Sequence, residues 1–387
     1  MTVPPLSGTL AGYRRPFAAL PDDLPTLSDV RRAMPPECFW RSAMRSFVYA
    51  IGSVSLTVGC AVLACYVLPA PSFSPLSILA WLAYAVVNGT IATGVWVVAH
   101  ECGHGAFSSQ EWLCDTVGFV LHSALLVPYF SWKRSHALHH SRTNHMTLGE
   151  THVPPYRRTG FAYERLYNWI GHDAFAVFNL VTHLLIGWPM YLLFGATGSP
   201  ARGKSNHFVP TNDKVFPGRS WKVKVLLSDV GVVSALAMIA LFSTSAAWAL
   251  GVYGGPYLVV NAWLVLYTWM HHTDVDVPHF SDEHWTWMKG ALCTVDRPYP
   301  ALIDFLHHHI GSTHVVHHID YRIPHYSAKA ATNAFVRKWP HLYKYDPTPV
   351  WRATWRVAGH CVRVIPIGKA WFYTSPAAKP AANQLEG

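Results

Sequence analysis

Eight histidines of this chain lie in three short segments whose spacing could bind metal ions. In a helix, residues three and four apart share a face, so the H-E-C-G-H segment places His100 and His104 side by side. Two later segments share the spacing HxxHH, and together they supply His136, His139, His140, His314, His317 and His318. Because a tetrahedral zinc ion takes four ligands, eight imidazoles predict a site for two metal ions.

A ninth histidine, His272, ends an apolar segment on the same side as the other eight, and we expect it to bind metal as well. Metal-bound imidazoles usually donate their second N–H group to a carboxylate or a carbonyl. The acidic candidates for this role are Glu101, Glu150, Asp274 and Asp282. We expect a further set of histidines to support the ligands or to lie at the surface, namely His145, His152, His279 and His325. His183 is expected to satisfy a hydrogen bond at the membrane interface.

Two other metal-dependent functions use similar residues. H-E-C-G-H also matches H-E-x-x-H, in which two histidines bind zinc and Glu101 is the general base of a metalloprotease. Such a protease needs a further ligand, and Asp229 is the only carboxylate inside a predicted span. This hypothesis leaves the six histidines of the HxxHH segments unexplained. A bis-histidine haem carrier would need facing histidines within the spans, whereas nearly all of them cluster at the span ends.

The composition predicts an integral membrane protein. Hydrophobic residues make up 51% of the 387 residues and charged residues only 13%, about half of the usual share. The uncharged runs 47–68 and 78–99 each reach the roughly 20 residues that cross a bilayer. The net charge of +9 does not indicate nucleic acid, because no basic stripe or zinc-finger spacing accompanies it. The seven cysteines form no C-x-x-C pair, which argues against a disulfide framework and a thiolate zinc site.

The apolar runs and the charges between them predict four crossings of the membrane. Six arginines and no lysine precede the first span and place the N-terminal arm in the cytosol. The run 117–130 is too short to cross, and six cations follow the run 174–195, so both are expected to be interfacial or re-entrant. The predicted spans are 47–68, 78–99, 225–249 and 257–270. Four crossings keep all the histidine segments and both termini in the cytosol.

The predicted fold is therefore an all-α integral membrane protein with four transmembrane helices, interfacial or re-entrant helices and a histidine-rich cytosolic cap that binds two metal ions. Residues 1–46 are expected to form a cytosolic arm with a short amphipathic helix near Leu27 to Met34. Residues 47–370 form the membrane domain, and residues 371–387 are expected to be a disordered tail. The N-terminus lacks a basic start followed by an apolar core, so the first span is expected to act as the targeting signal.

A two-metal histidine site at the membrane surface, beside spans that could shelter an acyl chain, suits O2-dependent attack on an unactivated C–H bond. In such chemistry the metal supplies the reactivity, and the protein supplies orientation and exclusion of water. The position of attack along the chain would depend on the depth of an apolar channel.

The chain resembles the membrane fatty-acid desaturases, in particular the delta-12 and omega-3 group that acts toward the methyl end. The resemblance is closest in the histidine segments H-E-C-G-H, S-H-A-L-H-H-S-R-T-N-H-M-T and T-H-V-V-H-H-I-D-Y-R-I-P-H-Y. It extends to M-P-P-E-C-F-W-R-S near residue 34, Y-G-G-P-Y-L-V-V-N at 253 and H-H-T-D-V-D-V-P-H-F at 271. Together these segments cover about residues 30–360.

This resemblance implies a di-iron centre with O2 as co-substrate. Its ligands would be His100, His104, His136, His139, His140, His272, His314, His317 and His318. The electrons would come from a separate cytochrome b5 and its reductase, since the chain has no H-P-G-G haem motif. The substrate would be an oleoyl chain carried by a phospholipid or by CoA. The protein would reside in the endoplasmic reticulum membrane, with its active site facing the cytosol.

The resemblance favours delta-12 desaturation, which converts oleoyl into linoleoyl lipid. The segments V-P-H-F at 277 and G-A-L-C-T-V-D-R at 290 follow the delta-12 pattern, whereas H-H-H-I-G-S-T at 307 follows the omega-3 (delta-15) pattern. Glu101 stands where plant delta-12 enzymes usually have aspartate. Relatives with nearly the same boxes hydroxylate, epoxidise or form triple bonds. The alternatives are therefore an omega-3 desaturase, a hydroxylase, an epoxygenase and an acetylenase.

Overall fold

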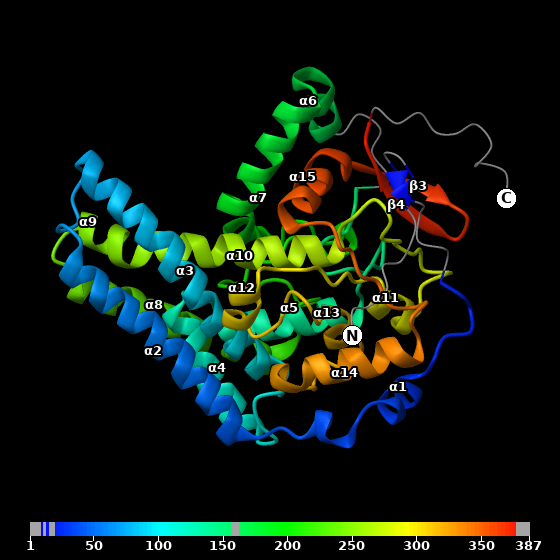
Figure 1. Cartoon of the computed structure of the whole chain (residues 1–387), viewed down its shortest axis with the longest axis horizontal. Coiled ribbons are helices and arrows are strands. Elements are labelled where there is room, and N and C mark those ends of the chain that lie inside the picture. The colour runs from blue at the N-terminus through cyan, green and yellow to red at the C-terminus, as the bar shows by residue number, and fades with distance from the viewer. Residues whose placement is uncertain (1–8, 11–12, 15–19, 156–161, 377–387) are drawn as a thin grey trace.

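The computed structural model describes residues 9–10, 13–14, 20–155 and 162–376, and helices dominate this part of the chain (Figure 1). Five helical segments in it are long and apolar enough to cross a membrane. Four are single helices, namely α2 (Ala43–Val67), α3 (Pro75–Gly103), α7 (His172–Phe194) and α8 (Gly218–Phe242). The fifth, Ala246–His272, consists of α9 (Ala246–Trp248), the π-helical turn η3 (Ala249–Gly254) and α10 (Gly255–His272).

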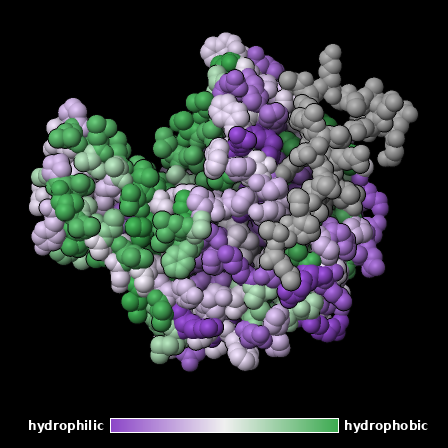
Figure 2. Space-filling view, in the orientation of Figure 1, coloured by the Kyte–Doolittle hydropathy of each residue, from purple (hydrophilic) through white to green (hydrophobic). Residues whose placement is uncertain are grey.

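Helices α2, α3, α8 and α10 extend into one end of the molecule, whereas α7 projects in a different direction (Figure 1). Helix α3 is central and contacts both α2 and α10. Gly89 lets α3 approach α10 closely, because a Cβ atom there would lie 2.5 Å from the Cβ atom of Val259. The outer faces expose apolar side chains such as Ile51 and Leu241, and Figure 2 shows a hydrophobic surface over this end. Such a large apolar surface indicates contact with lipid.

A sharply bent pair of helices carries the second histidine segment. Helix α4 (Glu111–Ala124) and helix α5 (Tyr129–Ser141) meet at a bend of 107°. The run 117–130, which we expect to be interfacial or re-entrant, covers the end of α4, this bend and the start of α5. The backbone N–H group of Phe130 donates to the Ser228 hydroxyl at 2.9 Å, which joins α5 to α8. The bend turns α5 and its histidines toward the end of α3.

The opposite end of the molecule is a more polar cap built from short helices (Figures 1 and 2). These are α1 (Leu27–Ala33), η1 (Pro36–Phe39), α11 (Trp287–Leu292), α12 (Ala301–Leu306), α13 (His314–Ile319), α14 (His325–Lys338) and α15 (Val350–His360). The remaining helices are α6 (Ala162–Ile170) and the turn η2 (Pro200–Arg202). The cap has its own buried apolar core, which joins Val30 of α1, Val315 of α13 and Phe335 of α14. This core fixes α13, and with it the third histidine segment.

The amphipathic helix that we predict near residues 27–34 is present as α1. It begins with a capping box, in which the Thr26 hydroxyl accepts the Asp29 N–H group and the Asp29 carboxylate accepts the Thr26 N–H group. Val30 is its buried residue, and Arg31 binds Asp320 of the cap at 2.7 Å. The helix therefore attaches the N-terminal arm to the cap.

A buried ion network connects the end of α10 to the cap. Arg297 is fully buried, and its guanidinium group contacts Asp346 and lies 2.7 Å from Asp274. Arg356 of α15 bridges the same two carboxylates at 2.5 Å and 2.6 Å. Arg297 also donates to the backbone carbonyl of Met270 at 3.1 Å. Because each buried charge has an opposite charge beside it, the network can position the end of α10 without an unpaired ion.

The structure differs from the predicted all-α fold at the C-terminus. Strand β3 (Arg363–Ile367) pairs antiparallel with β4 (Ala370–Thr374) through a two-residue turn in which Gly368 has a φ of 57°. The prediction of a disordered tail from 371 is therefore wrong for residues 371–374, because Phe372 is buried in the cap core. Ser375 is also buried and lies 3.2 Å from the Tyr167 hydroxyl, whereas residues 377–387 lie outside the described part. Short strands β1 (Thr9–Leu10) and β2 (Tyr13–Arg14) also pair near the N-terminus.

The third and fourth predicted spans have different bounds in the structure. The run 225–249 is not one helix, because α8 ends at Phe242 and Ser245 caps a new helix through its hydroxyl. Serine side chains that bind backbone N–H groups favour such breaks. The run 257–270 lies within α10, which begins two residues earlier at Gly255.

Candidate metal centre

The nine predicted ligands come from helix ends that converge where the apolar helices meet the cap. His100 lies in the last turn of α3, and His104 is the residue that caps it. His272 is the last residue of α10. The others belong to α5 (His136, His139, His140) and α13 (His314, His317, His318). The structure thus brings together nine histidines that lie up to 218 positions apart in the sequence.

The imidazole nitrogens form two neighbouring groups. In the first group, every ligand atom lies within 4.8 Å of the others, and its members are His100, His104, His136, His140 and His317. The second group, with the same spacing, consists of His139, His272 and His318. His314 joins the second group, because its Nε2 atom lies 3.2 Å from Nε2 of His272. Two groups of this kind are what a pair of metal ions requires.

The distances between the Nε2 atoms fit imidazoles that share a metal ion. They are 3.0 Å between His100 and His136, 3.2 Å between His100 and His104, and 3.1 Å between His139 and His272. Nitrogen ligands about 2.1 Å from a metal, at right to tetrahedral angles, lie about 3.0–3.4 Å apart. The donor set is therefore compatible with two metal ions, and imidazole ligands suit iron as well as zinc or copper.

The protonation of the rings also fits metal binding. Burial and the neighbouring imidazoles hold the pKa values of His317 and His318 well below the ordinary histidine value. Both rings are therefore neutral at physiological pH, and each has one nitrogen free to act as a ligand. Their Nε2 atoms are buried and have no hydrogen-bond partner among the described residues. Burying a polar nitrogen without a partner destabilises the folded protein, unless another group, such as a metal ion, binds to it.

Glu101 is the one predicted carboxylate with a direct contact to the nine histidines. Its Oε1 atom lies 3.4 Å from Nδ1 of His100, and its Oε2 atom accepts the backbone N–H group of His325 at 2.9 Å. Asp274 instead pairs with the two arginines of the buried network, and Asp282 lies near His145. In a metalloprotease Glu101 would activate a zinc-bound water, but here its Oε2 atom accepts a backbone N–H group and its Oε1 atom lies beside Nδ1 of His100. Asp229 belongs to neither histidine group within the described chain.

Two contacts to the ligands were not predicted from the sequence. The hydroxyl of Thr143 lies 3.2 Å from Nδ1 of His318 and can orient that ring. His271 stacks on His314, with ring centroids 3.9 Å apart, and lines a cavity beside the centre. Each residue has one signal in the sequence: Thr143 follows His139 by four positions, and His271 directly precedes His272.

The other predicted histidines occupy varied positions. His183 binds the backbone carbonyl of Asn179 at 2.9 Å, which confirms the expected hydrogen bond. His152 stacks on His272 with ring centroids 5.6 Å apart, and the His145 ring is tilted against Trp285 at 4.9 Å. The backbone of His325 binds Glu101, and His279 is buried against Tyr373. His152 and His325 thus support the centre, whereas His145 and His279 pack inside the cap.

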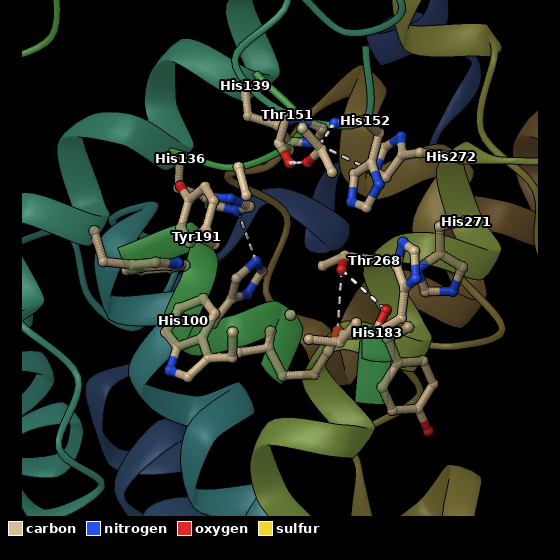
Figure 3. A pocket seen from close by; sticks show the side chains of 18 of the residues that line it. His100, His136, His139, Thr151, His152, His183, Tyr191, Thr268, His271 and His272 are labelled. Carbon is tan, nitrogen blue, oxygen red and sulfur yellow. Dashed lines mark hydrogen bonds between the residues drawn. The ribbon is translucent and has the colours of Figure 1, made fainter. Parts of the chain in front are cut away.

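An apolar cavity of about 280 Å³ opens beside the histidines. Five of the nine line it, namely His100, His136, His139, His272 and His314. Its other walls come mainly from α3, α7 and α10, and include Trp96, Val97, Ile186, Trp188, Leu264, Val265 and Thr268. Figure 3 shows His139 and His272 at one end of this space and His183 and Thr268 farther along it. The shape and lining suit an extended apolar ligand held against the metal centre.

These features define the class of the protein: it is a helical membrane protein with a histidine-rich centre that could hold two metal ions. The chain belongs to the fatty acid desaturase family, whose model matches residues 77–353. It is 40% identical over 358 residues to the omega-6 fatty acid desaturase, endoplasmic reticulum isozyme 1, of Glycine max, covering 91% of this chain and 90% of that protein. Two further relatives are each 39% identical to this chain, and each alignment covers 88% of it. One is a delta(12)-fatty-acid desaturase of Arabidopsis thaliana, of which the alignment covers 88%. The other is an oleoyl-12-hydroxylase of Ricinus communis, of which it covers 87%. The resemblance inferred from the histidine segments is confirmed.

Proposed function

We propose that this protein inserts the delta-12 double bond into oleoyl chains and so forms linoleoyl lipid. The observation that supports this most strongly is the similarity to delta-12 desaturases along about nine-tenths of the chain. The apolar cavity against five of the nine histidines supports it independently, because an acyl chain must reach the centre away from water.

We propose that the nine histidines hold two iron ions, with the five-membered group around one ion and the group containing His272 around the other. Bound iron would supply the O2-dependent attack on an unactivated C–H bond. The helices hold the rings in place for this chemistry. Trp132 stacks on His136 with ring centroids 4.6 Å apart, and Trp96 stacks on His100 at 5.4 Å. These indoles limit rotation of the ligand rings and keep water from one side of the centre.

The cavity walls would position the acyl chain. Apolar side chains from α3, α7 and α10 surround it, so a chain gains from burial there while its two reacting carbons lie against the histidines. Oleoyl already has a cis bend, and we expect its methyl-end half to enter the cavity. The depth of the cavity beyond the histidines would then set the carbon that is attacked.

We propose that the chain crosses the endoplasmic reticulum membrane four times and that α7 lies at the cytosolic interface. Two features support an interfacial α7: it points away from the direction of the other long helices (Figure 1), and six cations follow it within residues 202–224. This topology would place both termini, the cap and the metal centre in the cytosol. The relative from Glycine max is named as an endoplasmic reticulum isozyme, which agrees with this location.

We propose that a cytochrome b5, reduced by its reductase, delivers the electrons through a second cavity. This cavity of about 660 Å³ lies on the side of the centre where His104 and His140 are. Four basic residues line it (Arg31, Arg41, Lys133 and Arg322) against two acidic ones (Glu111 and Asp320), so its surplus of positive charge would attract an acidic protein. Electrons and acyl chain would then approach the same centre from two different cavities.

A 12-hydroxylase is the second candidate function, because the Ricinus communis relative matches almost as well as the desaturases. An omega-3 desaturase is the third. The test is expression in a eukaryotic host that makes oleate but no polyunsaturated lipid, followed by gas chromatography with mass-spectrometric location of double bonds. New linoleate supports the proposal. Ricinoleate as the main product would make the protein a hydroxylase, and conversion of fed linoleate alone would make it an omega-3 desaturase.

A further inference from the structure

One carboxyl group at the acyl cavity takes no part in holding the histidines. Glu150 is only 4% exposed and lines the cavity together with His100, His136 and His139. Its Oε1 atom lies 3.1 Å from the hydroxyl of Tyr191, and its Oε2 atom is buried without a hydrogen-bond partner among the described residues. Figure 3 shows the next two residues, Thr151 and His152, at the end of the cavity where His139 and His272 lie.

A buried chain of hydrogen bonds leads away from this carboxyl group. The Tyr191 hydroxyl lies 2.8 Å from the Ser135 hydroxyl, which in turn lies 2.9 Å from Nε2 of His207. The chain ends where Nδ1 of His207 lies 3.0 Å from the backbone carbonyl of Leu192. Ser135 and His207 are fully buried, so no water competes for these contacts.

The fixed end of this chain determines where its protons lie. A carbonyl oxygen only accepts, so Nδ1 of His207 carries the ring proton. Burial lowers the pKa of His207 to about 4, so the ring is neutral and its Nε2 atom must accept from Ser135. Tyr191 then donates to Ser135, and its oxygen is left to accept a proton from Glu150. The Ser135 hydroxyl also lies 3.1 Å from the Trp132 carbonyl, but that oxygen lies inside α5 and accepts a backbone N–H group of the helix as well. With the Ser135 proton on His207, the Tyr191–Ser135 and Glu150–Tyr191 contacts both contain a proton only when the Glu150 carboxyl group is protonated.

The opposite arrangement is less favourable. If Tyr191 donated to an ionised Glu150, either Nε2 of His207 would lose its donor or the two hydroxyl oxygens of Tyr191 and Ser135 would face each other at 2.8 Å without a proton between them. The surroundings agree with a neutral acid: burial raises the pKa of Glu150 to about 8, although the Tyr191 hydroxyl and the Arg202 charge act in the other direction.

We propose that Glu150 is a proton donor for the reduction of O2 at this site and that Tyr191, Ser135 and His207 hold its carboxyl group in position. The inference rests on the desaturase function proposed above. Formation of one double bond removes two hydrogen atoms from the acyl chain and reduces O2 to two waters. The reaction therefore consumes two electrons from the external donor protein and two protons.

Glu150 supplies one of these protons by turning its O–H group from Tyr191 into the cavity and breaking that O–H bond. Tyr191 can then turn its hydroxyl from Ser135 toward Oε1 and stabilise the carboxylate that remains. Water that enters after product release returns the proton. This turn leaves no proton between the Tyr191 and Ser135 oxygens, so the carboxylate is the less stable state and takes up a proton again.

The kinetic test compares Glu150→Gln, Glu150→Asp and the exposed control Glu283→Gln in purified full-length enzyme with a reducing donor protein. Glu150→Gln should lower kcat by about 100-fold or more, the usual contribution of a positioned acid, while KM and iron content stay within about twofold of the wild type. Glu150→Asp should recover part of kcat and shift its pH profile. A kcat of Glu150→Gln close to that of Glu283→Gln would overturn the proposal.

A spectroscopic test does not depend on activity. The infrared spectrum of the purified protein in lipid should contain the C=O stretching band of a protonated carboxylic acid, and this band should lose intensity in Glu150→Gln but not in Glu283→Gln. An unchanged band in Glu150→Gln would show that Glu150 is ionised and would refute the proposal. If the wild type formed no desaturated product, the proposed function would fail while this band still reported the state of Glu150.

Discussion

A methyl group added at Gly103 should disturb the metal centre through one tryptophan. Gly103 lies between the two histidines of H-E-C-G-H, and a Cβ atom there would lie 2.6 Å from the benzo ring of Trp132. Ordinary contact begins near 3.4 Å, so Gly103→Ala must move the indole by about 0.8 Å. Trp132 stacks on His136 at 4.6 Å and cannot move without displacing that ring.

Two opposing effects set the size of the change. Replacing glycine by alanine in a helix gains up to about 1 kcal/mol, whereas overpacking a filled site costs about 1–3 kcal/mol. Gly103 is the last residue of α3, where the gain is small, so stability should fall by no more than about 3 kcal/mol and the protein should still fold. Misplacing a catalytic group by about 1 Å can cost about 100-fold in rate. We expect Gly103→Ala to lower linoleate formation by about 10- to 100-fold.

The matched control is Gly59→Ala in α2, where a new Cβ atom meets no other atom within 4 Å. Product formation and iron content are measured for both variants in the same host. Trp132→Phe removes the benzo ring that causes the clash, so the double variant Gly103→Ala/Trp132→Phe should recover activity relative to Gly103→Ala. Equal product from Gly103→Ala and Gly59→Ala would refute the link between this packing and the centre.

Three further predictions concern the ligands, the cavity and the cap. His139→Ala and His317→Ala should each abolish product while the protein stays in the membrane fraction. The control His341→Ala, at an exposed position, should behave as wild type. Retained activity in His139→Ala or His317→Ala would remove that histidine from the proposed ligand set. Thr268→Trp should fill the cavity and stop product formation without loss of iron, with the exposed Thr116→Trp as its control. Arg297→Met should lower the free energy of unfolding by about 3 kcal/mol, because it removes one of the two arginines that contact Asp274 and Asp346. Denaturant unfolding in detergent measures this loss, and an unchanged midpoint would contradict it.

The sequence could predict which histidines come together, because their spacing follows the helix repeat. His100 and His104, one turn apart, lie in one group in the structure as expected. The division into two groups was not predictable, since His317 joins His100 while its neighbour His318 joins His139. That division depends on how α13 meets α3 and α5, which is set by contacts between residues distant in the sequence.

Other features depended on local chemistry or packing that the apolar pattern does not show. The break after α8 arises from Ser245, whose hydroxyl caps the next helix inside an otherwise apolar run. The C-terminal hairpin is held by Phe372, which packs in the cap core. Glu150 was a candidate to orient a ligand, but its position places it against Tyr191 instead.

The metal content of the purified full-length chain tests the central claim most directly. Two groups of histidines predict two iron ions per chain by elemental analysis, and fewer than one in His139→Ala or His317→Ala if the loss of one ligand destabilises the pair. A single zinc ion per chain that survives loss of His139 would contradict a two-iron centre and would favour a site built from H-E-C-G-H alone.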